Sequence, residues 1–91
     1  MIFNIRNKVP VTELLAGLAE EASELAQAAL KYRRTLTNDS PTPVSEDEAY
    51  DKLLEEIADV SLYTDTLYIN RTAIDLIKKA KLQRWINRLN L

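Results

Sequence analysis

The fold is decided by two stretches, EEASELAQA (residues 20–28) and LLEEIADVSLY (residues 53–63), which combine apolar and acidic residues at helical spacing. Around the first stretch, leucines recur at positions 14, 18 and 25, and around the second, apolar side chains recur at positions 53, 57, 60 and 67. Recurrence at intervals of three and four residues places side chains on one face of an α-helix. Both stretches are therefore predicted to lie in amphipathic helices.

Characteristic end signals set the predicted limits of these two helices. Pro10 and Thr12 indicate a helix start, with Thr12 as the expected cap. The run TLTNDSPTPV (residues 35–44) holds two of the three prolines and several small polar residues, so it predicts a loop. Ser45, with Glu48 three residues later, is a capping-box pattern and predicts the start of the next helix.

The C-terminal part of the chain predicts a third helix. It begins after Asn70 or Thr72, and apolar side chains then recur as far as Leu89. With 91 residues and a single glycine, the chain is expected to form one all-α domain. The predicted elements are helices at about 11–34, 46–69 and 72–90 and a loop at 35–45.

The composition excludes several classes of site. The chain has no cysteine and no histidine, which rules out thiolate nucleophiles, Ser-His-Asp triads, iron–sulfur clusters and the common zinc sites. A metal ion here has to be held by carboxylates and other oxygen atoms, which favours Mg²⁺, with Mn²⁺ as a substitute. Because no long apolar run is present, we expect a soluble, cytoplasmic protein without a membrane partner.

Charge is unevenly distributed along the chain. Residues 1–65 hold six Lys/Arg and thirteen Asp/Glu, a net charge of −7, whereas residues 66–91 hold six and one, a net charge of +5. The basic segment allows an interpretation as a DNA-binding helix. Trp85, Ile86 and Leu89 interrupt it as packing residues, however, and the rest of the chain is acidic, so nucleic acid is not the expected partner.

Two pairs of acidic residues lie at the edges of the apolar stripes. Glu21 with Glu24, and Glu56 with Asp59, are each three residues apart and therefore share a helix face. A carboxylate on a buried stripe requires a partner, and a divalent cation between two antiparallel helices supplies one for all four side chains. A solvated acidic face is the other interpretation of the same pattern.

The order of these motifs resembles the signature of the MazG-like nucleoside triphosphate pyrophosphohydrolases, the all-α family that includes dimeric dUTPases and dCTP pyrophosphatases. The resemblance covers about residues 12–90 and rests on EE-x-x-E from Glu20, a loop, E-x-x-D from Glu56 and a basic third helix. It implies Mg²⁺-dependent cleavage of an NTP or dNTP between the α- and β-phosphates. The products are the monophosphate and pyrophosphate, and the implied role is maintenance of the nucleotide pool.

The resemblance also implies roles for single residues. The implied metal ligands are Glu21, Glu24, Glu56 and Asp59. Glu20 and Glu24 are the implied catalytic carboxylates, with Glu20 placed to orient the attacking water, and the identity of the general base is left open. The implied substrate contacts are Tyr63, Lys78, Lys81, Arg84 and Arg88. Tyr63 also suits a packing role.

A protomer of this size, built from helices with one apolar stripe each, has too little core to bury its apolar side chains. We therefore expect a homodimer or homotetramer of the four-helix-bundle type, in which the basic helix of one subunit faces the acidic site of another. The alternative function is a noncatalytic helical module of the same fold that dimerises or binds a partner protein. Mg²⁺-dependent release of pyrophosphate distinguishes the two.

Overall fold

The computed structural model describes residues 2–37 and 43–91, so the middle of the loop expected at 35–45 lies outside the described residues. Four helices make up the described chain, and no strand occurs in it, which confirms the all-α prediction. They are α1 (Ile2–Lys8), α2 (Val11–Thr37), α3 (Glu46–Thr66) and α4 (Arg71–Leu89). Three helices were predicted, and the structure adds a fourth, the short helix α1, which precedes Pro10.

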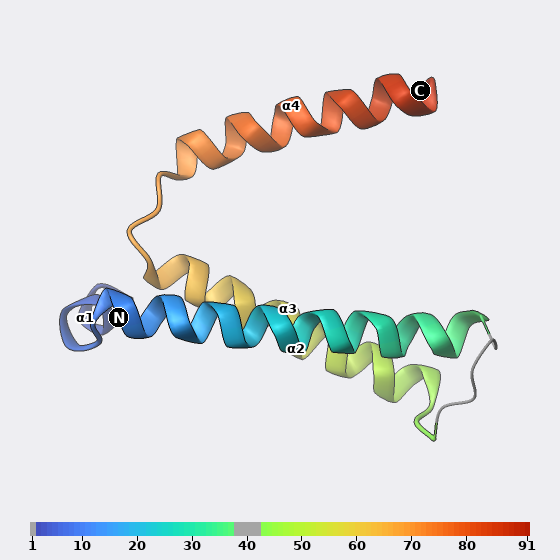
Figure 1. Ribbon diagram of the computed structural model, residues 1–91, viewed down its shortest axis with the longest axis horizontal. Helices are drawn as coiled ribbons and strands as arrows, with labels where there is room; N and C mark the ends of the chain where they lie inside the picture. The colour runs from blue at the N-terminus through green and yellow to red at the C-terminus, as the bar shows by residue number, and fades with distance from the viewer. Residues whose placement is uncertain (1, 38–42) are drawn as a thin grey trace.

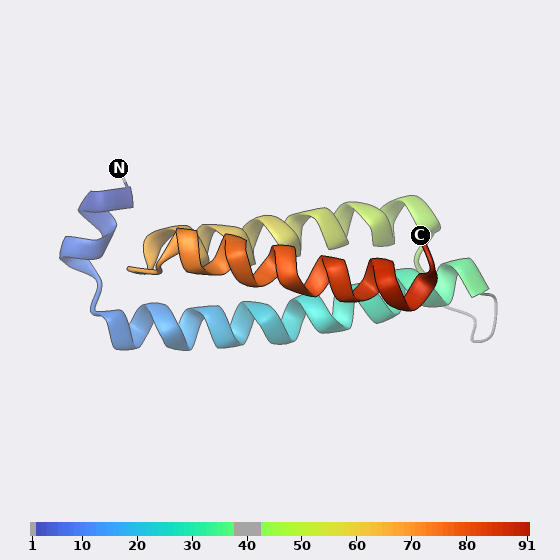
Figure 2. The ribbon, with the colours of Figure 1, turned by 90° about the horizontal axis from the view of Figure 1, so that it is seen from above.

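Helices α2 and α3 form an antiparallel pair, and they lie side by side along most of their length (Figures 1 and 2). Helix α1 contacts the end of α3 at one extremity of this pair. Helix α4 stands apart from the pair in Figure 1, beyond the linker that follows α3. The packed part of the protomer is therefore the α2–α3 pair, and any site within one chain has to be sought there.

The interface between α2 and α3 is apolar at its two ends. Leu14 and Leu67 are buried near the start of α2, and Ala28 and Ala49 are buried toward its other end. Beyond the alanines, the rings of Tyr32 and Tyr50 contact each other with their centroids 5.5 Å apart. Between these apolar ends the buried side chain is a glutamate, described below, which a purely structural helix pair would not require.

Two of the expected helix caps are settled by hydrogen bonds. The Ser45 hydroxyl accepts a bond of 3.1 Å from the Glu48 amide, which confirms the predicted start of α3. At the start of α4, the Asn70 side chain accepts a bond of 2.9 Å from the Ala73 amide. Asn70 is thus the cap of α4, and the alternative start at Thr72 is wrong because that residue already lies within the helix.

Helix α2 starts at Val11, where the sequence predicts, but its cap and its C-terminal end differ from the prediction. Its first turn begins at Val11, where the Pro10 carbonyl accepts bonds from the next turn, so Thr12 lies inside the helix and is not its cap. At the other end α2 continues past Arg34 to Thr37. The Thr35 hydroxyl donates a bond of 2.6 Å to the Tyr32 carbonyl, which satisfies this polar side chain within the helical turn.

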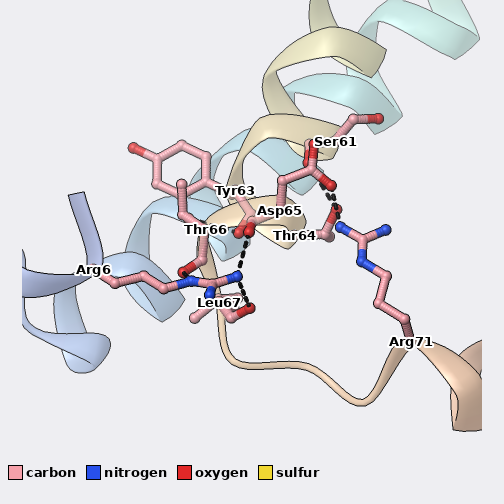
Figure 3. Close-up of polar contacts among 8 residues, drawn as sticks. All are labelled: Arg6, Ser61, Tyr63, Thr64, Asp65, Thr66, Leu67 and Arg71. Carbon is pink, nitrogen blue, oxygen red and sulfur yellow. Dashed lines mark hydrogen bonds and ion pairs between the residues drawn. The ribbon is translucent and has the colours of Figure 1, made fainter. Parts of the chain in front are cut away.

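Arg6 of α1 closes the C-terminal end of α3 (Figure 3). Its Nε donates a hydrogen bond of 2.8 Å to the carbonyl of Thr66, and its Nη2 donates one of 2.9 Å to the carbonyl of Asp65. The guanidinium also lies 4.5 Å from the centroid of the Tyr68 ring. Carbonyls in the last turn of a helix have no partner within it, and a cation there also complements the helix dipole. This contact explains why α3 ends at Thr66, earlier than predicted.

Helix α4 begins with an ion pair and continues without a buried residue. Arg71 at its start bonds to the carboxylate of Asp65 near the end of α3 (Figure 3). No side chain of α4 is buried, although the helix carries several large apolar residues. The exposed ones are Ile74, Leu76, Ile77, Leu82, Trp85 and Leu89. The apolar face of α4 is therefore not covered within one protomer.

None of the described helices is both long enough and apolar enough to cross a membrane.

Gly17 of α2 lies against the ring of Tyr63 from α3. A β-carbon at this position would overlap the far edge of the Tyr63 ring, which lies directly against the glycine. The absence of a side chain at Gly17 therefore makes room for the aromatic ring from the facing helix. The packing role considered for Tyr63 is thus present in the structure.

Replacing Gly17 by alanine is expected to have opposite effects in two backgrounds. In the wild type it should destabilise the protein by about 1–2 kcal/mol, because the Tyr63 ring has to move out of a packed position. In a Tyr63→Ala background the same change should stabilise the protein by about 1 kcal/mol, because alanine is the better helix former. Chemical denaturation of the four proteins of this cycle measures both values, and an equal effect in the two backgrounds would contradict the contact.

Candidate functional site

Three of the four predicted metal ligands come together at the middle of the α2–α3 interface. Glu21 and Glu24 project from α2 and Glu56 from α3, and one carboxylate oxygen from each lies within 4.8 Å of the others. Glu56 is 1% exposed, Glu21 is half-buried, and Glu24 is exposed. We refer to Glu21, Glu24 and Glu56 as the carboxylate cluster.

The fourth predicted ligand, Asp59, lies one helical turn beyond Glu56 on α3 and is half-buried. It is not among the residues whose oxygens meet within 4.8 Å. Its negative charge nevertheless contributes to the raised pKa of Glu21, so it lies close enough to act on the cluster. Asp59 therefore belongs to the same acidic region without sharing the tight contact of the other three.

Two oxygens of the carboxylate cluster have no hydrogen-bond partner. Oε2 of Glu56 and Oε2 of Glu21 are buried and accept no bond from any described residue. The other oxygen of Glu56, Oε1, lies 2.9 Å from Nζ of Lys52, one turn earlier on α3. Leaving a buried carboxylate oxygen without a donor costs about 1–3 kcal/mol or more, which a structural role alone does not explain.

The carboxylate cluster shifts the pKa values of its members in opposite directions. The pKa of Glu21 is raised from 4.5 to about 7, first because the carboxyl is withdrawn from water and then because of the negative charges of Glu24, Asp59 and Glu56. The pKa of Glu56 is lowered, because Lys52 donates a hydrogen bond to its carboxylate. Without a cation, Glu21 is therefore partly protonated near neutral pH.

These residues fit a divalent cation that prefers oxygen ligands. Three carboxylates from two helices meet at one point, and two of their oxygens are free of other partners. Mg²⁺ and Mn²⁺ bind through carboxylate oxygens together with water and substrate phosphates. Exposed acidic groups on surface helices are common without an ion. A glutamate such as Glu56, which is only 1% exposed and has a carboxylate oxygen without a hydrogen-bond partner, is uncommon.

A pocket of about 440 Å³ adjoins the carboxylate cluster between the second half of α2 and the start of α3. Its charged lining consists of two carboxylates, Glu24 and Glu56, and three cations, Lys31, Arg34 and Lys52, and its uncharged lining is Gln27, Ala28 and Leu30. We refer to this space as the basic pocket. These cations were not among the predicted site residues, although Lys52 lies four residues before Glu56 and Lys31 lies seven after Glu24, and residues at these spacings share a helix face.

A second, more apolar pocket of about 360 Å³ lies on the other side of the cluster, toward α1. It contains Tyr63, which was a predicted substrate contact, together with Leu14 and Thr66. The pocket that contains Tyr63 therefore lies on one side of the carboxylate cluster, and the basic pocket lies on the other side. Glu20, a predicted catalytic residue, is exposed on α2 directly before Glu21 and is not part of the cluster.

The predicted substrate contacts of the third helix lie on α4, and all of them are exposed. They are Lys78, Lys81, Arg84 and Arg88. Because α4 stands apart from the α2–α3 pair, one chain does not bring them to the carboxylate cluster (Figure 1). Their role at the site stays a prediction, and it requires a second protomer.

Comparison with known proteins adds no support to the family resemblance. No family model matches the chain, and no curated protein and no solved structure matches it at a significant level. The function is therefore inferred from the geometry of the carboxylate cluster, the basic pocket that adjoins it and the pocket at Tyr63.

Proposed function

We propose that the protein is a Mg²⁺-dependent nucleoside triphosphate pyrophosphohydrolase, as the resemblance of its acidic motifs implies. The observation that carries this proposal is the buried, unpartnered Oε2 of Glu56, which meets carboxylates from the facing helix. A site with several negative charges, in which Lys52 donates to Glu56 and two buried carboxylate oxygens have no donor among the described residues, suits a divalent cation. The adjoining cations suit the remaining charge of a polyphosphate.

The proposed reaction adds water across the α–β anhydride of the substrate. A bond forms between the water oxygen and the α-phosphorus, the bond to the bridging oxygen breaks, and pyrophosphate leaves with the electron pair. A bound divalent cation supplies positive charge that offsets the phosphate oxygens and lowers the pKa of water. The water proton passes to a nearby carboxylate, and the proposed acceptors are Glu24 of the cluster and Glu20, which precedes the cluster on α2.

This chemistry requires no residue type that the chain lacks. Phosphoryl transfer depends on positioning and charge neutralisation and needs no covalent nucleophile. The carboxylate cluster provides the fixed negative charges, and the helices that carry it are held together by apolar contacts at both ends. The pocket beside Tyr63 is lined mostly by apolar groups, which suits a nucleobase and ribose.

The test is the release of pyrophosphate from a panel of NTPs and dNTPs, canonical and modified, with Mg²⁺ and with excess EDTA. We expect release from at least one nucleotide with Mg²⁺ and none with EDTA. A noncatalytic helical module would release no pyrophosphate from any member of the panel under either condition. Analysis of both products separates cleavage at the α–β bond, which yields the monophosphate, from removal of the γ-phosphate.

We also propose that the protein is a homodimer or a homotetramer. The proposal is supported by the uncovered apolar face of α4, which includes Leu76, Leu82 and Trp85, and by exposed leucines on α2 and α3 such as Leu30 and Leu62. Charge is complementary as well, because the α4 segment carries a net charge of +5 and the remainder −7. A second copy that places α4 against an α2–α3 pair satisfies both requirements.

Light scattering at micromolar concentration measures the mass of the assembly and so tests this proposal directly. The expected mass is two or four times the 10.4 kDa of the protomer. A Leu82→Glu/Trp85→Glu variant should lower the mass, because it places charge in the apolar face. A mass of one protomer for the wild type would contradict the proposal and would indicate that α4 folds back on its own chain.

A further inference from the structure

We propose that the basic pocket binds the pyrophosphate part of a metal-bound polyphosphate, with Lys31 and Arg34 as its phosphate contacts. The inference rests on the proposed function and adds the direction in which the substrate lies. The phosphates extend from the carboxylate cluster toward the C-terminal half of α2, and the nucleoside extends the other way, toward Tyr63. It assigns the phosphates to cations of α2 and not to those of α4.

The first argument is the availability of the two cations. Neither Lys31 nor Arg34 forms an ion pair with any residue in the described ranges, although both line a pocket that also contains Glu24 and Glu56. Lys52, the third cation, is committed to Glu56 at 2.9 Å. The basic pocket thus contains one cation that balances the cluster and two whose charge is left for a ligand.

The second argument is the combination of charges in one space. Carboxylates alone favour a cation and repel phosphate, whereas Lys and Arg alone favour phosphate. A metal-bound polyphosphate requires both, with carboxylates on the metal and cations on the phosphate oxygens that the metal does not neutralise. Glu56, whose Oε2 has no hydrogen-bond partner, lines the same pocket as Lys31 and Arg34, which form no ion pair with a described residue.

The third argument is size. The basic pocket has a volume of about 440 Å³, which lies within the range of about 300–1,000 Å³ that is typical of small-molecule sites. It accommodates a pyrophosphate group with hydrating water. A nucleic acid backbone would require a longer basic track, and the acidic residues beside this pocket would repel it.

Another role for these cations is stabilisation of the α2 dipole. Arg34 lies in the last turn of α2, where a cation is favourable. Lys31 lies earlier, and the dipole effect is confined to the last turn, so this role does not account for Lys31. Removal of a cation that acts only on the dipole lowers the melting temperature without changing the affinity for a phosphate ligand, so the two roles can be distinguished.

Calorimetric titration of inorganic pyrophosphate into the full chain, at saturating Mg²⁺, tests the inference. Mg²⁺ is titrated first on its own. Lys31→Gln and Arg34→Gln are each expected to weaken pyrophosphate binding by about tenfold or more while Mg²⁺ binding stays unchanged, because each removes one charge-assisted contact. Arg33→Gln is the matched control, since Arg33 is exposed on the same turn of α2 and does not line the pocket.

The possible results separate this inference from the proposed function. Normal Mg²⁺ binding with unchanged pyrophosphate affinity in both Lys31→Gln and Arg34→Gln overturns the inference alone. An equal loss in Arg33→Gln also overturns it, because the effect would then reflect general charge. Weaker pyrophosphate binding by Lys81→Gln, with unchanged binding by Lys31→Gln, would overturn the inference and assign the phosphates to α4. Absence of Mg²⁺ binding by the wild type overturns both the metal site and the inference.

Discussion

Replacing Glu56 by glutamine is expected to lower the rate of Mg²⁺-dependent pyrophosphate release by about a hundredfold or more. Glu56 is the most deeply buried member of the carboxylate cluster, and its Oε2 has no other partner. Glutamine preserves the shape of the side chain but removes the negative charge that holds a divalent cation. Because the carboxylates position one ion together, we expect comparable losses for Glu21→Gln, Glu24→Gln and Asp59→Asn.

Glu55→Gln is the matched control for this series. Glu55 precedes Glu56 on α3, but its side chain is 65% exposed, and its one ion pair with a described residue is to Lys52, at 3.7 Å. It should retain nearly the full rate. Circular dichroism should show that the cluster variants remain folded, because removing one of several neighbouring like charges relieves repulsion when no cation is bound.

Two outcomes of this series would revise the account. Full activity in two or more of the four cluster variants would contradict the metal site. Full activity in Asp59→Asn alone would limit the site to the three residues whose oxygens meet within 4.8 Å.

The second large effect is expected in thermal stability. Mg²⁺ at a hundredfold excess over its dissociation constant should stabilise the folded state by about 2.7 kcal/mol, because it binds the assembled cluster and not the unfolded chain. For a chain of this size the melting temperature should rise by on the order of 10 °C. NaCl at equal ionic strength only screens charge, so its effect should be smaller. The Mg²⁺ effect should shrink sharply in Glu24→Gln and Asp59→Asn.

The pH dependence of stability follows from the raised pKa of Glu21. Its pKa is about 7 in the folded state and 4.5 as the reference value, so between these values the folded state binds more protons than the unfolded state. Stability therefore falls as the pH rises from about 4.5 to above 7 when no Mg²⁺ is present. The lowered pKa of Glu56 acts in the opposite sense, but only as the pH falls below 4.5.

Melting curves at a series of pH values measure this dependence. Mg²⁺ should reduce the loss of stability with rising pH, since it favours the ionised cluster. Glu21→Gln should remove the part of this loss that Glu21 causes, even without Mg²⁺. A fall of equal size in Glu21→Gln and the wild type would show that other groups cause it. Identical responses to Mg²⁺ and NaCl in the wild type would favour the interpretation as a solvated acidic face.

The helices that carry the site could be predicted from sequence because local patterns determine them. Ser45 and Glu48 form a cap that needs no tertiary contact, and the apolar spacing around Glu21 and Glu56 places both on the packed faces. Helix α1 could not be predicted in this way. It has seven residues, and it is held against α3 by hydrogen bonds from Arg6 to carbonyls some sixty positions away in the sequence. No local sequence pattern reveals such a contact.

The candidate site could be predicted only in part for the same reason. The three-residue spacing of the acidic pairs was sufficient to place Glu21, Glu24 and Glu56 on facing stripes. It could not show that Asp59 lies outside the tight contact, because that depends on how α2 and α3 are rotated against each other. The basic residues of α4 were assigned by resemblance, and the separation of α4 from the pair depends on a linker whose geometry the sequence does not specify.

The central claim is that the carboxylate cluster binds a divalent cation, and calorimetric titration of Mg²⁺ into the wild type and Glu56→Gln at pH 7 tests it most directly. The same titration in two buffers of different ionisation enthalpy counts the protons released. The account predicts saturable binding by the wild type with release of protons, because the pKa of Glu21 is raised to about 7 and the ion displaces its proton. It predicts much weaker binding by Glu56→Gln. Absence of binding by the wild type, or equal binding by the two proteins, would contradict it.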